Sequence, residues 1–128
     1  MLEHKIRRIG PVFIIDLAGR VSMAEAIAFG PGSGNTLREI VRGVLEEGAQ
    51  KVLINLTEVS YIDSSGIGEL FGAYSSLQRQ GGQLKLLNPN RAVREVLKLT
   101  KMNTILDVRD DEFEAIQAFD KPATAAGG

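Results

Sequence analysis

Short runs of apolar residues alternate along this chain with longer stretches in which apolar residues recur every three or four positions. Short runs bounded by turn residues are typical of strands, and we predict strands at residues 5–9, 12–17, 51–56, 83–87 and 104–108. The run VFIIDL at 12–17 is apolar almost throughout, which predicts a strand covered on both faces. Residues 57–63 are expected to turn the chain into the next element.

Helical spacing predicts four helices between and after these strands. Thr36 and Glu39 fit a capping box at the start of the first helix, and Gly48 is expected just beyond its end. Residues 91–99 form the third helix, and the aspartates at 110–111 cap the fourth. The apolar positions at helical spacing are Leu37, Ile40, Val41, Val44 and Leu45 in the first helix, Ile67, Leu70, Phe71, Tyr74 and Leu77 in the second, Val93, Val96 and Leu97 in the third, and Phe113, Ile116 and Phe119 in the fourth.

The order of these elements predicts the fold class. Strands that alternate with helices indicate an α/β fold with crossover connections and a mostly parallel sheet. The first two strands are joined by the short Gly10-Pro11 turn, which adds an antiparallel edge and makes the sheet mixed. We therefore predict one domain of about five strands flanked by about four helices over residues 3–120, followed by a flexible tail at 121–128.

Composition and charge narrow the class of protein. Hydrophobic residues make up 44% of the chain and charged residues 24%, as in soluble globular domains. The formal net charge of −1 predicts no direct nucleic-acid partner. No apolar run reaches the roughly 20 residues that span a bilayer, and the first ten residues lack the apolar core of a signal peptide. We expect no membrane insertion and a cytoplasmic location.

We also expect no cofactor and no metal site. The chain has no cysteine and a single histidine, His4, so thiolate chemistry and the common zinc ligand sets are excluded. A glycine-rich stretch at residues 30–35 lacks the lysine that a phosphate-binding loop requires, which favours a plain flexible loop. A small nucleotide-binding or hydrolytic protein remains a hypothesis that depends on this stretch alone.

The segment after the strand at 51–56 carries the strongest functional signal. In α/β sheets, sites gather beyond the carboxyl ends of strands and near helix N-termini. Residues 63–68 read DSSGIG, and Asp and Ser are favoured helix caps, so a cap alone is the simpler interpretation. The alternative is a phosphorylation site. Two early glycines cost the helix about 1 kcal/mol each and let another molecule approach, while a helix N-terminus tolerates phosphate.

A catalytic serine is not expected in this segment. Neither Ser64 nor Ser65 fits the G-x-S-x-G nucleophile elbow. A serine nucleophile also needs a base, and the chain offers only His4 and no Ser-x-x-Lys pattern near this turn. We therefore expect a protein without enzymatic activity.

The run KVLINLTEVSYIDSSGIGEL resembles the central signature of STAS-domain anti-sigma factor antagonists. That signature is an apolar strand and a short turn followed by Asp-Ser-Ser-Gly, a hydrophobic residue and Gly. The similarity continues through GGQLKLLNPNRAVREVLKLTKMNTILDV and covers nearly the whole chain. The resemblance implies a small STAS-like α/β domain, in agreement with the fold predicted from the pattern of elements.

The resemblance also implies a function and its residues. Ser64 would be the phosphoacceptor, Asp63 would order the turn, and Ser65, Gly66 and Gly68 would complete the surface that binds the partner. That partner would be an anti-sigma factor that is itself a serine kinase. The unphosphorylated antagonist would bind it and release the sigma factor, phosphorylation would end the complex, and a serine phosphatase would restore the active form.

A second function fits the same resemblance. STAS modules also work as interaction domains in other assemblies, such as accessory subunits of lipid transport or signalling scaffolds. In such a protein Ser64 would be a helix cap and no more. The residues leave both functions open.

Overall fold

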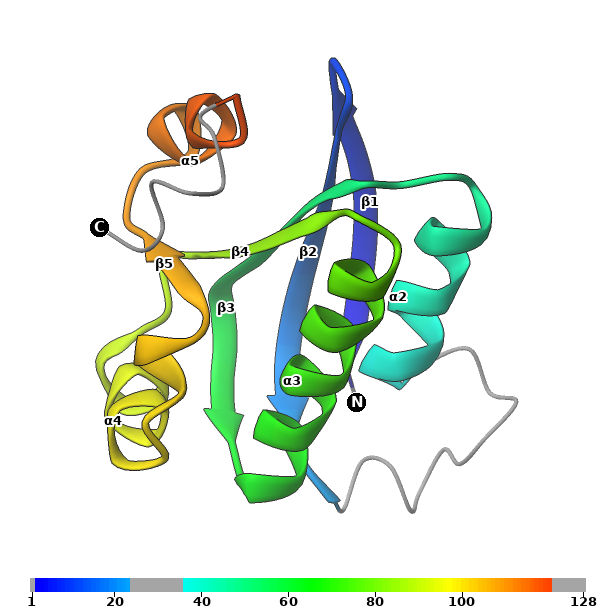
Figure 1. The fold of residues 1–128 in the computed structure, drawn as a ribbon. Coiled ribbons are helices and arrows are strands. Elements are labelled where there is room, and N and C mark those ends of the chain that lie inside the picture. Colours follow the sequence, from blue (N-terminus) through cyan, green and yellow to red (C-terminus); the bar gives the residue numbers. More distant parts are fainter. Residues whose placement is uncertain (1, 24–35, 121–128) are drawn as a thin grey trace.

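The computed structural model of the chain describes residues 2–23 and 36–120. It contains one five-stranded sheet in the order β1-β2-β3-β4-β5 (Figure 1). The strands are β1 (Glu3–Ile9), β2 (Val12–Val21), β3 (Lys51–Ile62), β4 (Gln83–Leu87) and β5 (Asp107–Arg109). The described helices are α2 (Leu37–Glu46), α3 (Ser64–Arg79), α4 (Arg91–Leu99) and α5 (Glu112–Ala118), with a short 3₁₀ helix η1 (Met102–Thr104).

The pairing of the strands confirms the predicted mixed sheet. β1 runs antiparallel to β2, and the remaining neighbours are parallel. The hairpin between β1 and β2 turns at Gly10, whose φ of +58° lies in the left-handed region that glycine adopts without strain. The glycine-rich stretch at 30–35 and the predicted tail at 121–128 lie outside the described residues.

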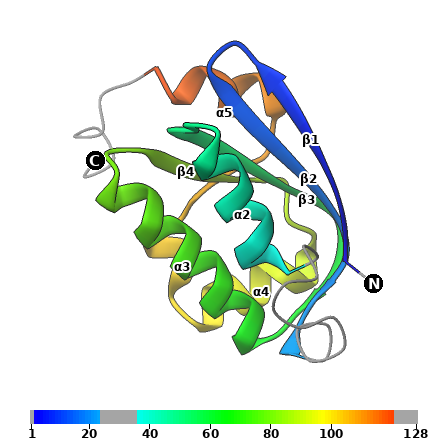
Figure 2. The same cartoon turned by 90° about the vertical axis from the view of Figure 1, so that its right-hand side faces the viewer.

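Helices cover both faces of the sheet, as the apolar run at 12–17 predicts. Side chains alternate across a strand, so Phe13 and Ile15 of β2 join the larger apolar core with α2, α3 and α4. Val12 and Ile14 point to the other face and pack with Phe119 beneath α5. Figure 2 shows α2 and α3 side by side against the first face.

The caps that the sequence predicts for the first and last helices are confirmed. Thr36 accepts the Glu39 N–H at the start of α2, and Gly48 follows the helix with a φ of +88°. Asp111 accepts the Glu114 N–H at the start of α5. Asp110 instead forms an ion pair with Arg94, so only one of the two adjacent aspartates is a cap.

Three local predictions are wrong. The strand at 51–56 continues to Ile62, so residues 57–62 form a parallel ladder with the end of β2 instead of a turn. The strand predicted at 104–108 starts too early: η1 ends at Thr104, and β5 covers only Asp107–Arg109. Phe113 is 70% exposed, because Ala115 and Phe119 fill the space between α5 and the sheet.

Candidate functional site

The carboxyl end of β3 passes into α3 through a single residue, Asp63. Its backbone is extended (φ −111°, ψ −176°), and its Oδ1 accepts the Gly66 N–H at 2.9 Å. The Asp63 carbonyl oxygen accepts the Ile67 N–H at 2.9 Å, which is the first regular bond of the helix. The predicted cap is therefore present, and Ser64 is the first residue of α3.

The second oxygen of the same carboxylate accepts a hydrogen bond from the segment that directly follows β2. Oδ2 of Asp63 accepts the Met23 N–H at 3.0 Å, and the Asp63 N–H is directed to the Val21 carbonyl oxygen at 3.3 Å. Burial alone would raise the pKa of Asp63, but the N–H groups of Met23 and Gly66 outweigh it and lower the pKa. The ionised Asp63 carboxylate thus links the segment after β2 to the junction between β3 and α3.

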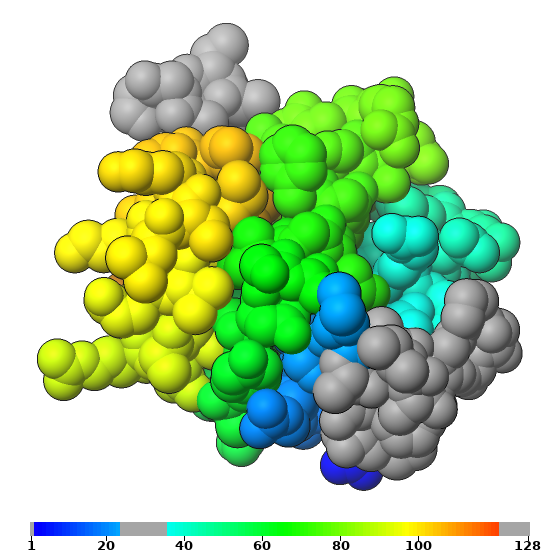
Figure 3. Space-filling model, turned by 90° about the horizontal axis from the view of Figure 1, so that it is seen from below, coloured from blue at the N-terminus to red at the C-terminus, as the bar shows by residue number. Residues whose placement is uncertain are grey.

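Ser64 is exposed at this junction, and Ser65 is half-buried beside it. Figure 3 views the molecule from this end and shows the end of β2 next to the start of α3. A hydroxyl at the first helical position stands where the free N–H groups and the helix dipole favour negative charge. The geometry therefore combines access for another protein with an environment that accepts a phosphate.

The two glycines of the predicted contact surface have different surroundings. Gly66 is buried, and a Cβ built on it would lie 2.3 Å from the Val21 carbonyl oxygen and 2.7 Å from Ile62 Cγ1. Glycine at this position lets α3 pack closely on the ends of β2 and β3. Gly68 is exposed and has no described atom within 4 Å of the same position, which leaves room for a partner.

Sequence reasoning did not assign three exposed large side chains to this site, and it placed Phe71 among the apolar positions of the second helix. Met23 follows β2 by two residues, Tyr61 lies in β3 and Phe71 lies in α3. Phe71 lies seven residues after Ser64 and therefore on the same side of α3, a spacing that could have signalled it. The Arg20 guanidinium lies 4.2 Å above the Tyr61 ring. We call Met23, Tyr61, Ser64, Gly68 and Phe71 the serine rim.

Two further observations concern the chemistry of the described residues. In residues 2–23 and 36–120, no group of three or more His, Asp or Glu side chains is placed to hold a metal ion. None of the described helices is long and apolar enough to cross a membrane. The described residues of the site present an exposed hydroxyl, a carboxylate and exposed aromatic side chains, a combination that suits recognition by another protein.

Comparison with known proteins identifies the family. The profile of the STAS domain matches residues 5–115, and the chain belongs to the STAS-domain family of anti-sigma factor antagonists. The anti-sigma-B factor antagonist of Bacillus subtilis is 36% identical over 94 residues, which are 73% of this chain and 78% of that protein. The anti-sigma F factor antagonist of Paenibacillus polymyxa is 25% identical over 83 residues, 61% of this chain and 71% of that protein.

Solved structures share the fold. The crystal structure of an anti-sigma factor antagonist from Mycobacterium paratuberculosis has a TM-score of 0.79 at 17% identity and covers 94% of this chain and 96% of its own. The Bacillus cell fate determinant SpoIIAA in its phosphorylated form has a TM-score of 0.64 at 22% identity, with 91% and 98% of the two chains covered. At these identities the likeness shows the fold alone.

Proposed function

We propose that this protein is a non-enzymatic anti-sigma factor antagonist that phosphorylation at Ser64 switches off. The observation that carries the proposal is the exposed Ser64 at the start of α3, directly after the capping carboxylate of Asp63. The names of the Bacillus and Paenibacillus relatives support the role, and SpoIIAA, a structural neighbour, has been solved in phosphorylated and unphosphorylated forms. The partner would be an anti-sigma factor with serine kinase activity, acting in the cytoplasm.

The modification itself is an ordinary phosphoryl transfer. The Ser64 hydroxyl oxygen attacks the γ-phosphorus of ATP, its proton passes to a base of the kinase, and the bond to the leaving ADP breaks. The product carries about −1.5 to −2 charges at neutral pH. The N-terminus of α3 accommodates these charges, so the fold persists while the surface changes. A serine phosphatase would hydrolyse the ester and restore the hydroxyl.

The serine rim explains why this charge would end a complex. In the unphosphorylated state, a partner can cover Ser64 together with Gly68, Tyr61 and Phe71. A dianion beside the ionised Asp63 would have to lose its water against this apolar surface, and it would face the like charge of the carboxylate. A loss of about 3 kcal/mol weakens binding by more than a hundredfold.

The experiment incubates the chain with the anti-sigma serine kinase from the same cell and with ATP, and locates phosphate by mass spectrometry. We expect one phosphate, on Ser64. Ser64→Ala should abolish the modification while keeping the fold and the binding of the partner. The matched control Ser65→Ala removes the neighbouring, half-buried hydroxyl and should still be modified. Phosphate on Ser65 or elsewhere in Ser64→Ala would refute the assignment.

A STAS interaction module in another assembly remains the second proposal. The hydrogen bonds of Asp63 support it, because they suffice for an ordinary helix cap without any phosphate. A measurement of partner binding by wild type and by Ser64→Asp separates the two functions. A module of this kind, such as a lipid-transport accessory subunit or a signalling scaffold, would bind its partner equally well as wild type and as Ser64→Asp.

A further inference from the structure

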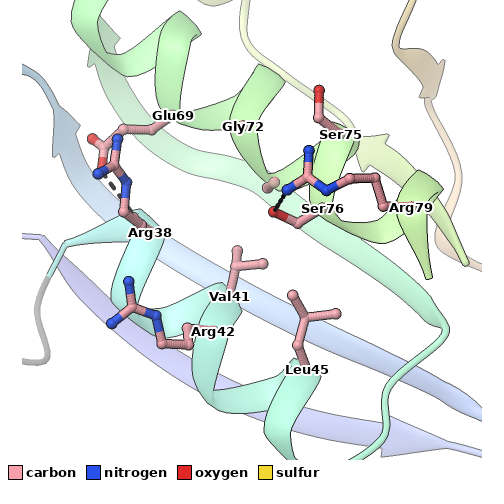
Figure 4. Close-up of a pocket in the computed structure, with 10 residues that line it drawn as sticks. Arg38, Val41, Arg42, Leu45, Glu69, Gly72, Ser75, Ser76 and Arg79 are labelled. Atoms are coloured by element: carbon pink, nitrogen blue, oxygen red, sulfur yellow. Dashed lines mark hydrogen bonds between the residues drawn. The ribbon is translucent and has the colours of Figure 1, made fainter.

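A groove runs between α2 and α3, apart from the serine rim. Its cavity volume is about 330 Å³. Figure 4 shows that side chains from both helices border it. The lining residues are Arg38, Val41, Arg42 and Leu45 from α2, and Glu69, Gly72, Ala73, Ser75, Ser76 and Arg79 from α3.

The groove concentrates positive charge in a nearly neutral chain. Three guanidinium groups border it, from Arg38, Arg42 and Arg79, against one carboxylate, that of Glu69. None of the three arginine side chains forms an ion pair with a carboxylate in residues 2–23 and 36–120. Arg7, by contrast, is held by two carboxylates at once. Arg38 is attracted to Glu69, and Arg79 donates to Ser76 Oγ at 3.3 Å without meeting a carboxylate. Arg42 and Arg79 therefore carry most of the charge that the groove offers to a ligand.

The arginines and the apolar side chains follow separate lines along α2. Arg38 and Arg42 lie one turn apart, and so do Val41 and Leu45. Gly72 of α3 borders the groove without a side chain, and apart from its chain neighbours and the nearby backbone of α3, no described atom lies within 4 Å of the place where its Cβ would stand. A bare backbone at this point lets a second backbone come close.

The length of the groove indicates the form of its ligand. From Glu69 to Arg79, α3 advances about 15 Å, which is three turns of helix. Val41 is only 2% exposed, so the apolar surface of the groove is the half-buried Leu45 beside the exposed Gly72 backbone. With cations along its border, this surface matches a helix that carries apolar residues on one face and acidic residues beside them.

We propose that the groove between α2 and α3 binds an acidic amphipathic helix of a partner protein. The acidic residues of that helix pair with Arg42 and Arg79, and its apolar residues lie over the half-buried Leu45 and the bare backbone of Gly72. Arg38 and Glu69 offset each other's charge at the end nearer the serine rim, so the acidic residues of the bound helix concentrate toward the other end. This site does not depend on phosphorylation of Ser64.

The test uses the full chain labelled with nitrogen-15 and titrated with a synthetic amphipathic helical peptide of Leu, Ala and Glu. We expect the backbone signals of α2 and α3 that border the groove to shift. The double variant Arg42→Glu/Arg79→Glu should weaken binding at least about tenfold. The matched control Arg91→Glu/Lys98→Glu makes the same change of charge at two exposed positions of α4 and should leave the affinity unchanged.

Several results would overturn the proposal. Shifts spread over all basic surfaces, or an equal loss in both double variants, would mean nonspecific attraction. Equal binding of a peptide with Lys in place of Glu would exclude recognition by charge. Inorganic phosphate that shifts the same signals while the peptide does not would identify a small-anion site instead. If the double variant unfolds, Arg42→Glu and Arg79→Glu alone must each weaken binding.

Discussion

Two aspartates with lowered pKa values lie in different surroundings. Asp16 of β2 is held by the Arg7 guanidinium, with Nε–Oδ2 at 2.6 Å and Nη2–Oδ1 at 2.9 Å, and this contact is the largest cause of its lowered pKa. Among the described residues, Asp63 is held by backbone N–H groups and by no side chain. Arg7 Nη2 also donates to Glu112 Oε1 of α5 at 2.6 Å, so the charges of Arg7, Asp16 and Glu112 are paired with one another.

Asp16 thus belongs to an internal network of ion pairs, whereas Asp63 lies in the region where we propose that a partner binds. Around Asp16, side-chain charges satisfy one another and fasten α5 to β1 and β2, and Asn55 adds a further hydrogen bond at 2.8 Å. Around Asp63, the backbone supplies the partners, so the neighbouring Ser64 and Gly68 stay free to meet another molecule. A charge added at Ser64 therefore changes the surface more than the core.

The largest effect is expected beneath the serine rim. Ile67 is 6% exposed in the main core, and Ile67→Asp would bury an unpaired charge and unfold the domain. The matched control Phe71→Asp places the same charge on the exposed side of α3, where Phe71 is 41% exposed, and should keep the fold. Thermal melting followed by circular dichroism measures both. A normal melting curve for Ile67→Asp would refute this placement of the helix.

The next effect concerns the Asp16 network. Arg7→Ala should lower the free energy of unfolding by about 1–2 kcal/mol, because Asp16 and Glu112 lose their shared donor. These groups are partly exposed, which keeps the loss moderate. Urea unfolding provides the measurement, and Arg91→Ala on α4 is the control, expected within about 0.5 kcal/mol of wild type. Equal stability of the two variants would contradict a stabilising network.

A smaller loss is expected at the cap. Asp63→Ala removes both hydrogen bonds of the carboxylate and should cost about 1 kcal/mol, while Asp63→Asn keeps an acceptor oxygen and should cost less. The same urea titration measures both variants. If alanine and asparagine were equivalent, the side-chain oxygen at Asp63 would contribute nothing to the stability of α3.

The smallest effect is the dependence of stability on pH. A carboxyl with a lowered pKa in the folded state stabilises the fold above its unfolded pKa of about 3.9 and loses that contribution as the pH falls through the folded pKa. The free energy of unfolding should therefore decline on acidification, less steeply in Asp16→Asn and Asp63→Asn than in wild type. Unchanged slopes in both variants would contradict the lowered pKa values.

Local sequence signals predicted the fold and the cap at Asp63 well. The N-cap at Asp63 involves only the four residues from Asp63 to Gly66, so it is visible in the local sequence. The apolar run at 12–17 is likewise enough to predict a strand that is buried on both faces. The end of β3 escaped prediction because Thr57, Glu58 and Ser60 interrupt the apolar pattern. Those residues lie beyond the end of β4, where β3 pairs with β2 alone, so polar side chains are tolerated.

The site was predicted only in part, because its remaining members are brought together by the fold. Met23, two residues beyond β2, meets the cap only through its N–H bond to Asp63, a residue 40 positions away in the sequence. Tyr61 joins the region because β3 continues to Ile62. The need for glycine at Gly66 is likewise invisible in the sequence, since it arises from the Val21 carbonyl oxygen of a distant strand. The groove between α2 and α3 depends in the same way on how two helices pack.

The most direct test of the central claim compares the affinity of the unphosphorylated chain for its anti-sigma factor with that of the chain phosphorylated at Ser64. Calorimetry on both forms, with circular dichroism to verify equal folding, provides the measurement. We predict a loss of about a hundredfold or more in affinity, with an unchanged fold. Equal affinity of the two forms would contradict the proposal that a charge at the start of α3 controls the complex.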